Sequence, residues 1–95
     1  KKVDVIYDKD AFGAISRDRW TEYIEVMTSV LLPGGYVWLE GKQKTSDKLN
    51  GPPYHLELDE MVQLWNGYEL IHHIPCLYDS VVENWSQTVF IFKKL

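Results

Sequence analysis

The sequence lacks the features that mark disulfide-rich, nucleic-acid-binding or membrane proteins. Its single cysteine, Cys76, cannot form a disulfide within the chain. The 10 lysines and arginines are outnumbered by 14 aspartates and glutamates, so the net charge is -4 and no basic surface is available for nucleic acid or anionic lipid. No stretch approaches the roughly 18 consecutive apolar residues of a membrane span. We therefore expect a soluble, cytoplasmic protein whose partners include neither nucleic acid nor a membrane.

An initiator methionine is also absent. The chain starts with Lys1 and Lys2 and moves straight into an apolar segment, although its 95 residues are enough for one small domain. We expect a piece of a longer protein, so a targeting segment could still lie upstream of it.

Apolar patterning predicts strands that alternate with helices. The β-branched and aromatic residues of segment 3–7 predict a strand that ends sharply at Asp8. Ser16 is a candidate N-cap for an amphipathic helix over residues 17–32, which Pro33-Gly34-Gly35 should stop. The remaining pattern predicts strands at 36–40, 68–74 and 89–92, a helix at 57–65, and polar connections at 41–53 and 75–87.

The order of these segments predicts the sheet. Two right-handed strand-helix-strand crossovers give three parallel strands. Strand 89–92 has no helix before it, so it should return antiparallel. Its apolar residues suit burial on both faces, whereas Glu69, His72 and His73 suit a strand at the edge. The last strand should therefore lie between the second and third. This predicted α/β arrangement resembles the carboxyl-terminal half of the Rossmann-like sheet in class I methyltransferases.

Polar residues follow the predicted parallel strands, at the edge where open α/β sheets usually bind ligands. They are Asp8, Lys9 and Asp10 after the first strand, residues 40–42 after the second and residues 75–78 after the third. The first group could be a polar clamp at a site or a solvated turn. Gly51-Pro52-Pro53-Tyr54 could likewise be a stiff wall over this edge or a plain linker.

With both segments in view, the chain resembles the thiopurine S-methyltransferase family, which also includes thiol and halide methyltransferases. The aspartate-basic turn combined with Gly-Pro-Pro-aromatic is the most specific part of the resemblance, which covers nearly the whole chain in order. The matching segments are residues 5–15, Leu31-Leu32-Pro33-Gly34-Gly35, Gly51-Pro52-Pro53-Tyr54, the following helix with Glu60 and Leu64-Trp65, and Trp85 before the last strand.

The resemblance implies transfer of a methyl group from S-adenosylmethionine to a soft nucleophile such as a thiol, a halide or a thiopurine. Alignment of nucleophile and methyl, with exclusion of water, can supply the catalysis, so no catalytic residue is assigned. The resemblance implies cofactor contacts for Tyr7, Asp8 and Lys9, and a substrate pocket formed by Lys9, Asp10, Phe12, Pro52, Pro53, Tyr54 and Trp85, with Trp85 on a loop over the rim.

Two departures from the family pattern bear on the acceptor. The family commonly has arginine and glycine where this chain has Lys9 and Asp10, and lysine lacks the planar fork of arginine. Members that act on thiopurines carry an arginine at the position of Val81. A small thiol or halide therefore fits this chain better than a thiopurine.

The glycine-rich turn with which class I enzymes hold the cofactor is missing, because Gly34-Gly35 leads from a helix into a strand. We expect this turn upstream, in an amino-terminal half that completes a single methyltransferase domain. That half, or an oligomeric partner, should cover the apolar edge of strand 3–7 and stabilise the chain. A non-catalytic α/β interaction module with the same topology is the alternative.

Composition also offers His55, His72, His73 and Cys76 as metal ligands. Adjacent strand residues such as His72 and His73 point to opposite faces, so no metal site is expected. Trp20, Trp38 and Trp65 are predicted to be core residues.

Overall fold

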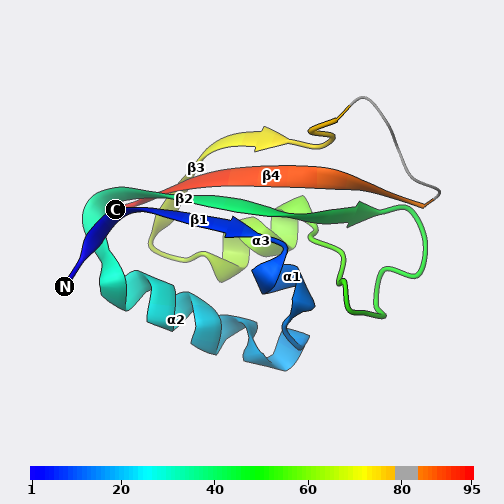
Figure 1. Ribbon diagram of the computed structural model, residues 1–95, viewed down its shortest axis with the longest axis horizontal. Helices are drawn as coiled ribbons and strands as arrows, with labels where there is room; N and C mark the ends of the chain where they lie inside the picture. The colour runs from blue at the N-terminus through cyan, green and yellow to red at the C-terminus, as the bar shows by residue number, and fades with distance from the viewer. Residues whose placement is uncertain (79–83) are drawn as a thin grey trace.

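A computed structural model describes residues 1–78 and 84–95, which form a four-stranded sheet with helices against one face (Figure 1). The elements are β1 (Val3–Lys9), α1 (Ala11–Ala14), a 3-10 helix (Arg17–Arg19), α2 (Trp20–Val30), β2 (Leu31–Lys44), α3 (Leu58–Leu64), β3 (Tyr68–Ile74) and β4 (Trp85–Lys94). Within these described ranges, none of the helices has the length and apolarity that a membrane crossing requires.

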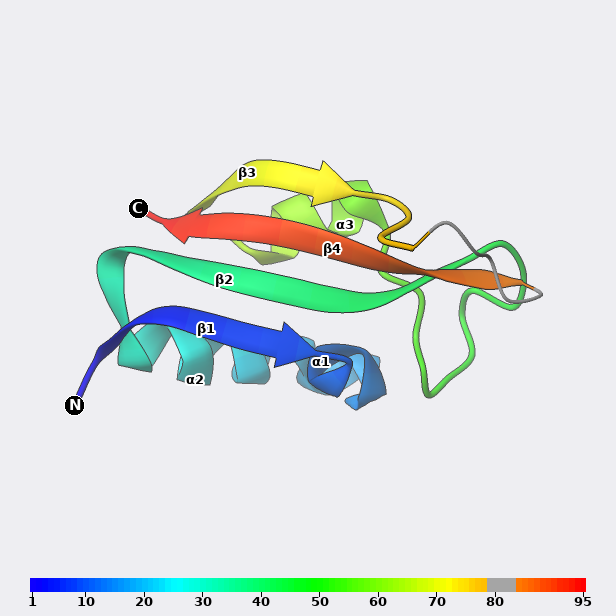
Figure 2. The ribbon, with the colours of Figure 1, turned by 45° about the horizontal axis from the view of Figure 1, so that its top comes forward.

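The strand order is β1-β2-β4-β3, as the sequence predicts (Figure 2). Strands β1 and β2 are parallel, and β4 runs antiparallel to both of its neighbours, β2 and β3. The last strand therefore lies inside the edge strand β3. Its residues Val89, Phe90 and Phe92 are almost fully buried, which is the burial that the placement requires.

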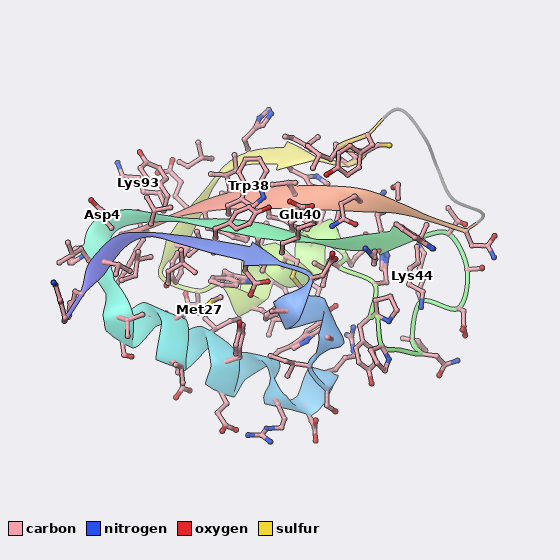
Figure 3. All side chains as sticks on the ribbon, viewed as in Figure 1. Asp4, Met27, Trp38, Glu40, Lys44 and Lys93 are labelled. Carbon is pink, nitrogen blue, oxygen red and sulfur yellow. The ribbon has the colours of Figure 1, made fainter. Side chains whose placement is uncertain are left out.

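The two faces of the sheet differ in what covers them. Val37 and Leu39 of β2 face the helices and are fully buried, together with Phe12, Trp20 and Trp65. Residues two apart on a strand share a face, so the alternate positions of β1 and β2 form the opposite, open face. Figure 3 shows Trp38 and Glu40 on this open face and Met27 on the helix side.

Two of the three tryptophans predicted as core residues are confirmed. Trp20 and Trp65 are buried among the helices. Trp38 is only half-buried, because the pleat of β2 turns it to the open face. There it lies near the exposed Tyr7, with 6.1 Å between the ring centres.

The first predicted helix is shorter and less regular than expected. A 3-10 turn precedes α2, which ends at Val30 instead of residue 32. Ser16 makes no capping bond, because its hydroxyl donates to Asp18 Oδ1 at 2.7 Å. The turn after α2 does use Gly34 at a positive φ of 81°, as its lack of a Cβ allows.

Strand β2 extends beyond the predicted 36–40 at both ends. Leu31 already pairs with Val3, and residues 32–35 form an irregular bulge before the pairing resumes at Tyr36. At the other end, residues 41–44 pair with Trp85–Thr88 of β4. Residues 41–44 were expected in a connection, because their polar side chains hide the apolar alternation that marks a strand. Leu31 and Leu32 were instead expected to end the helix over residues 17–32, with residues 33–35 as its stop.

Candidate functional site

Asp8 is a fixed carboxylate at the carboxyl end of β1. It is only 4% exposed. Its Oδ1 accepts hydrogen bonds from the backbone N–H groups of Ala11 at 3.1 Å and Phe12 at 3.2 Å, which start α1. Its Oδ2 accepts the hydroxyl of Tyr23 in α2 at 2.9 Å. The sequence analysis did not predict helix α1. The side chain of its N-cap residue, Asp10, makes no capping bond, and the carboxylate of Asp8 binds the first N–H groups instead.

Asp10 links the turn after β1 to the two central strands. It has a left-handed φ of 65°, and its backbone N–H donates to the carbonyl of Glu40 at 2.8 Å. Its Oδ1 accepts Lys42 Nζ and Gln87 Nε2, both at 3.1 Å. Asp10 is thus held by β2 and β4 through its side chain.

Asp10, Glu40, Lys42 and Gln87 form a connected group that we call the rim cluster. Gln87 Nε2 donates to Glu40 Oε2 at 2.8 Å, and Gln87 Oε1 accepts Lys42 Nζ at 2.6 Å. Glu40 Oε1 accepts the indole N–H of Trp38 at 2.9 Å. Glu40 and Gln87 are buried, so these bonds replace the water that their polar atoms lose.

Trp85 is the first residue of β4 and does not lie on a loop, which corrects the expectation from the sequence. Its backbone pairs with Lys44, so it belongs to the extended part of the β2–β4 ladder. Lys42 Nζ lies over the Trp85 ring, 4.4 Å from the ring centre. This contact connects the predicted pocket residue to the rim cluster.

The segment Gly51-Pro52-Pro53-Tyr54 approaches the same end of the sheet. The N–H of Tyr54 donates to the carbonyl of Gly13 at 2.9 Å, and the N–H of Leu56 donates to the carbonyl of Lys42 at 3.0 Å. Lys44 Nζ donates to the carbonyl of Pro53 at 3.1 Å. Residues 54–56 thus lie beside β2 where β1 has ended.

His55 anchors this segment. Its Nδ1 accepts the backbone N–H of Lys44 at 2.8 Å, which leaves Nε2 as the protonated nitrogen that donates to Glu57 Oε1 at 2.8 Å. This hydrogen bond lowers the pKa of Glu57 below its ordinary value. Both ring nitrogens of His55 have partners, and the described residues hold no group of three or more potential metal ligands.

The other residues named from the sequence do not all converge. Tyr7 and Lys9 are exposed on the open face, while the pleat turns Asp8 to the helix side. Pro52 and Pro53 are exposed, but Tyr54 packs edge-on against Trp20 with 6.2 Å between the ring centres.

One of the named residues, Phe12, does not line the rim. Phe12 is fully buried and stacks on Trp20 at 4.7 Å, so its side chain is part of the core instead of an accessible pocket surface. Val81 lies outside the described residues.

Gln87 is the site residue that sequence reasoning missed. It lies in a stretch that was expected to be a connection, and a lone glutamine there carries no signal. The segment after β3 also reaches Gln87, since the backbone N–H of Leu77 donates to the carbonyl of Gln87 at 2.8 Å.

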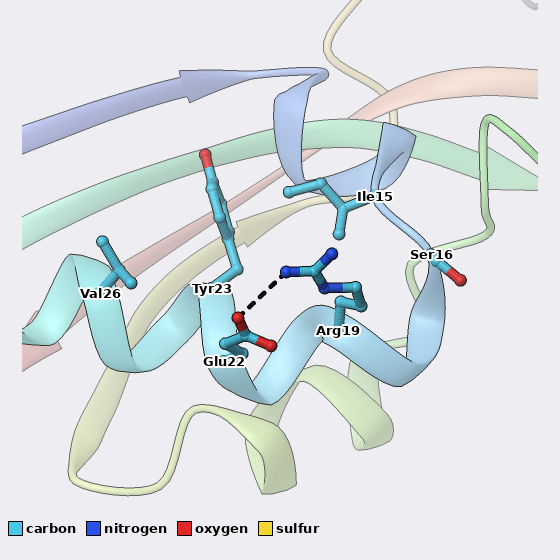
Figure 4. Close-up of a pocket in the computed structure, with 6 residues that line it drawn as sticks. All are labelled: Ile15, Ser16, Arg19, Glu22, Tyr23 and Val26. Carbon is cyan, nitrogen blue, oxygen red and sulfur yellow. Dashed lines mark hydrogen bonds and ion pairs between the residues drawn. The ribbon is translucent and has the colours of Figure 1, made fainter.

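A separate open groove of about 460 Å³ lies along α2, beside the Tyr23 ring (Figure 4). Its charged part is the ion pair of Arg19 and Glu22, whose atoms are 3.0 Å apart. This exposed ion pair adds little to the stability of the fold, because water screens the attraction between its charges. The groove is lined by Ile15, Ser16, Arg19, Glu22, Tyr23 and Val26, none of which was named as a site residue.

Comparison with known proteins agrees with this geometry. The family model for thiopurine S-methyltransferase matches residues 1–92. The thiopurine S-methyltransferase of Vibrio campbellii is 33% identical over 87% of this chain and 37% of its own length. That of Vibrio parahaemolyticus is 26% identical over 97% of this chain and 46% of its own length. The chain thus spans less than half the length of these curated relatives.

The crystal structure of TehB from Haemophilus influenzae shares the fold. It superposes with a TM-score of 0.69 and 17% identity, covering 100% of this chain and 36% of that protein. This likeness confirms the predicted fold class, an α/β chain with the sheet of the carboxyl-terminal half of class I methyltransferases. With its strand order, its aspartate-basic turn and the match over residues 1–92, the chain belongs to the thiopurine S-methyltransferase family.

Proposed function

We propose that this chain is the carboxyl-terminal part of an S-adenosylmethionine-dependent methyltransferase that acts on a small soft nucleophile, a thiol or a halide. The family match over residues 1–92 carries the proposal. The structure supports it with a fixed carboxylate, Asp8, at the carboxyl end of a parallel strand. This is the edge at which open α/β sheets bind their ligands.

The residues present fit one side of the cofactor. Tyr7 offers an exposed ring and Lys9 an exposed ammonium group, both on the open face beside the end of β1. Asp8 holds the turn that follows these residues. S-adenosylmethionine would supply an electrophilic methyl group on a sulfonium ion. Since the chain has no glycine-rich turn after a strand, we assign most of the cofactor affinity to the upstream half.

On the acceptor side, Asp10, Pro52, Pro53, Tyr54 and Trp85 would border the nucleophile. Lys9 would attract an anionic one. Phe12 would support this wall from the core, where it packs against Trp20. A thiolate or halide needs no covalent assistance from the protein, so orientation and exclusion of water are the tasks left to these residues.

We further propose that the missing amino-terminal half covers β1 in the active protein. Val3, Val5 and Tyr7 are 43%, 58% and 64% exposed on this edge strand. An apolar strand with unpaired backbone groups would ordinarily be paired or covered. The acidic composition and lone cysteine are compatible with the cytoplasmic location expected from the sequence.

The test is calorimetric binding of S-adenosylhomocysteine to this chain and to the natural protein that contains it. We expect binding by the longer protein and little or none by the 95 residues alone. In the longer protein, Asp8→Ala should weaken binding, whereas Glu22→Ala, which removes a carboxylate from the separate groove, should not. Binding by neither form would favour the non-catalytic interaction module.

A further inference from the structure

We propose that Lys42 is a specificity-determining residue that covers one face of Trp85 and so disfavours flat aromatic acceptors that would stack there. The inference rests on the proposed methyl transfer and names a residue that would select the compact thiol or halide acceptor. Lys42 comes from β2 and Trp85 from β4, and both lie on the open face of the sheet. They are brought together only by the extended pairing of these two strands.

The ammonium group of Lys42 is held in place from several sides. It lies 4.4 Å from the centre of the Trp85 ring, where the electron-rich face attracts a cation. Two of its three N–H donors are used by Asp10 Oδ1 at 3.1 Å and Gln87 Oε1 at 2.6 Å. Its side chain is 16% exposed, so water competes weakly for these contacts.

A flat acceptor that stacks on this face of Trp85 would need the position that Lys42 holds. Aromatic rings stack with centres roughly 4.5–7 Å apart. Lys42 Nζ, 4.4 Å from the centre of the Trp85 ring, already fills the space that a stacked ring would take on this face. Displacing Lys42 would leave the oxygen atoms of Asp10 and Gln87 without their charged donor, which costs free energy. A small thiol or a halide does not require the ring face and avoids this cost.

Asp10 explains why this chain can keep Lys42 there. The residue adopts a left-handed φ of 65°, a conformation that glycine adopts without strain. Glycine at this position would provide no carboxylate for Lys42. The aspartate instead accepts hydrogen bonds from both Lys42 and Gln87. It thereby links the turn after β1 to the Lys42 ammonium group that lies over the Trp85 ring.

The experiment measures kcat/KM of the natural protein that contains this chain, with 6-mercaptopurine as the flat acceptor and 2-mercaptoethanol as the compact one. The acceptor ratio is kcat/KM for 6-mercaptopurine divided by kcat/KM for 2-mercaptoethanol. Lys42→Ala should raise this ratio roughly threefold to tenfold, the gain expected from one aromatic stacking contact. Lys42→Arg keeps a cation over the ring and should leave the ratio within about twofold. The ratio is independent of the fraction of folded enzyme.

Lys94→Ala is the matched control. Lys94 also donates two hydrogen bonds, to the carbonyls of Thr28 and Leu31, but it lies at the opposite end of β4. Its loss should lower stability without changing the acceptor ratio. If Lys42→Ala does not fold, Asp10→Asn loosens the hold on Lys42 at nearly constant volume and should raise the same ratio.

Two results would overturn the inference alone. These are an unchanged ratio in the Lys42 and Asp10 variants, and a wild-type enzyme that already prefers 6-mercaptopurine. Failure of the proposed function is distinguishable from both, since the wild-type protein would then neither bind S-adenosylhomocysteine nor methylate either thiol.

Discussion

The hydroxyl of Tyr23 donates a hydrogen bond to Asp8 Oδ2 at 2.9 Å and thereby joins α2 to the end of β1. Burial and the negative charge of Asp8 both oppose ionisation of the phenol, which raises the pKa of Tyr23 to about 12. The other oxygen of Asp8 is bound by the backbone of α1. The orientation of this carboxylate therefore depends on a residue 15 positions away in the sequence.

The first prediction concerns alkaline pH. Because the pKa of Tyr23 is higher in the folded state than the roughly 10 of an unfolded chain, its contribution to stability is complete below pH ~10 and is lost between pH ~10 and ~12. Tyr23→Phe should lower the free energy of unfolding at pH 7 by about 1–2 kcal/mol. Urea unfolding at several pH values should show a smaller alkaline loss in the variant. Parallel losses in both proteins would contradict this.

The central part of the fold was predictable because its signals are local and apolar. Helical spacing in α2 and the all-apolar residues 89–92 of β4 reflect burial, and burial decided the strand order. The ends of β2 and β4 were not predictable, because residues such as Lys42 and Gln87 are polar even though they pair as strand. Their place in the ladder follows from tertiary pairing alone.

The candidate site could be located from the sequence but not assembled. The strand ends identified Asp8 and Asp10, because carboxyl ends of parallel strands meet at one edge. The partners of Asp10 could not be identified, since Gln87 lies 77 residues away. Phe12 was misplaced for a different reason: an aromatic residue after a polar turn can face either the pocket or the core, and here Asp8 directs the backbone of α1 toward the core.

The second prediction concerns the carboxyl-terminal end of α2. Lys94 Nζ donates to the carbonyl of Thr28 in the last turn of α2 at 2.8 Å and to that of Leu31, just beyond the helix, at 2.7 Å. Carbonyls in the last turn of a helix lack partners within the helix. Lys94→Met keeps the aliphatic stem and should lower the free energy of unfolding by about 1–2 kcal/mol. Chemical denaturation provides the measurement. Lys93→Met, the adjacent substitution on the opposite face, should change stability by less than about 0.5 kcal/mol.

The third prediction concerns the bulge at the start of β2. A Cβ on Gly35 would lie 2.8 Å from the carbonyl oxygen of Asp4 and 2.9 Å from that of Leu32. Because both are backbone atoms, Gly35→Ala must shift the pairing of β1 with β2 and should cost about 1–3 kcal/mol. Gly13→Ala is the control, since its nearest contact is an ordinary 3.7 Å and alanine suits a helix. Equal stability of the two variants in thermal unfolding would refute the role of Gly35.

The last prediction concerns the exposed edge of β1. If the 95-residue chain is prepared alone, its apolar strand should pair with another copy, because the backbone groups on this edge and side chains such as Val5 have no cover in the described fold. Sedimentation velocity should show self-association that grows with concentration. Val5→Lys should suppress it, because a charge on an edge strand opposes pairing. Val62→Lys, at an exposed position of α3, should not. A monomeric wild-type chain with a cooperative melt would show that the edge needs no partner.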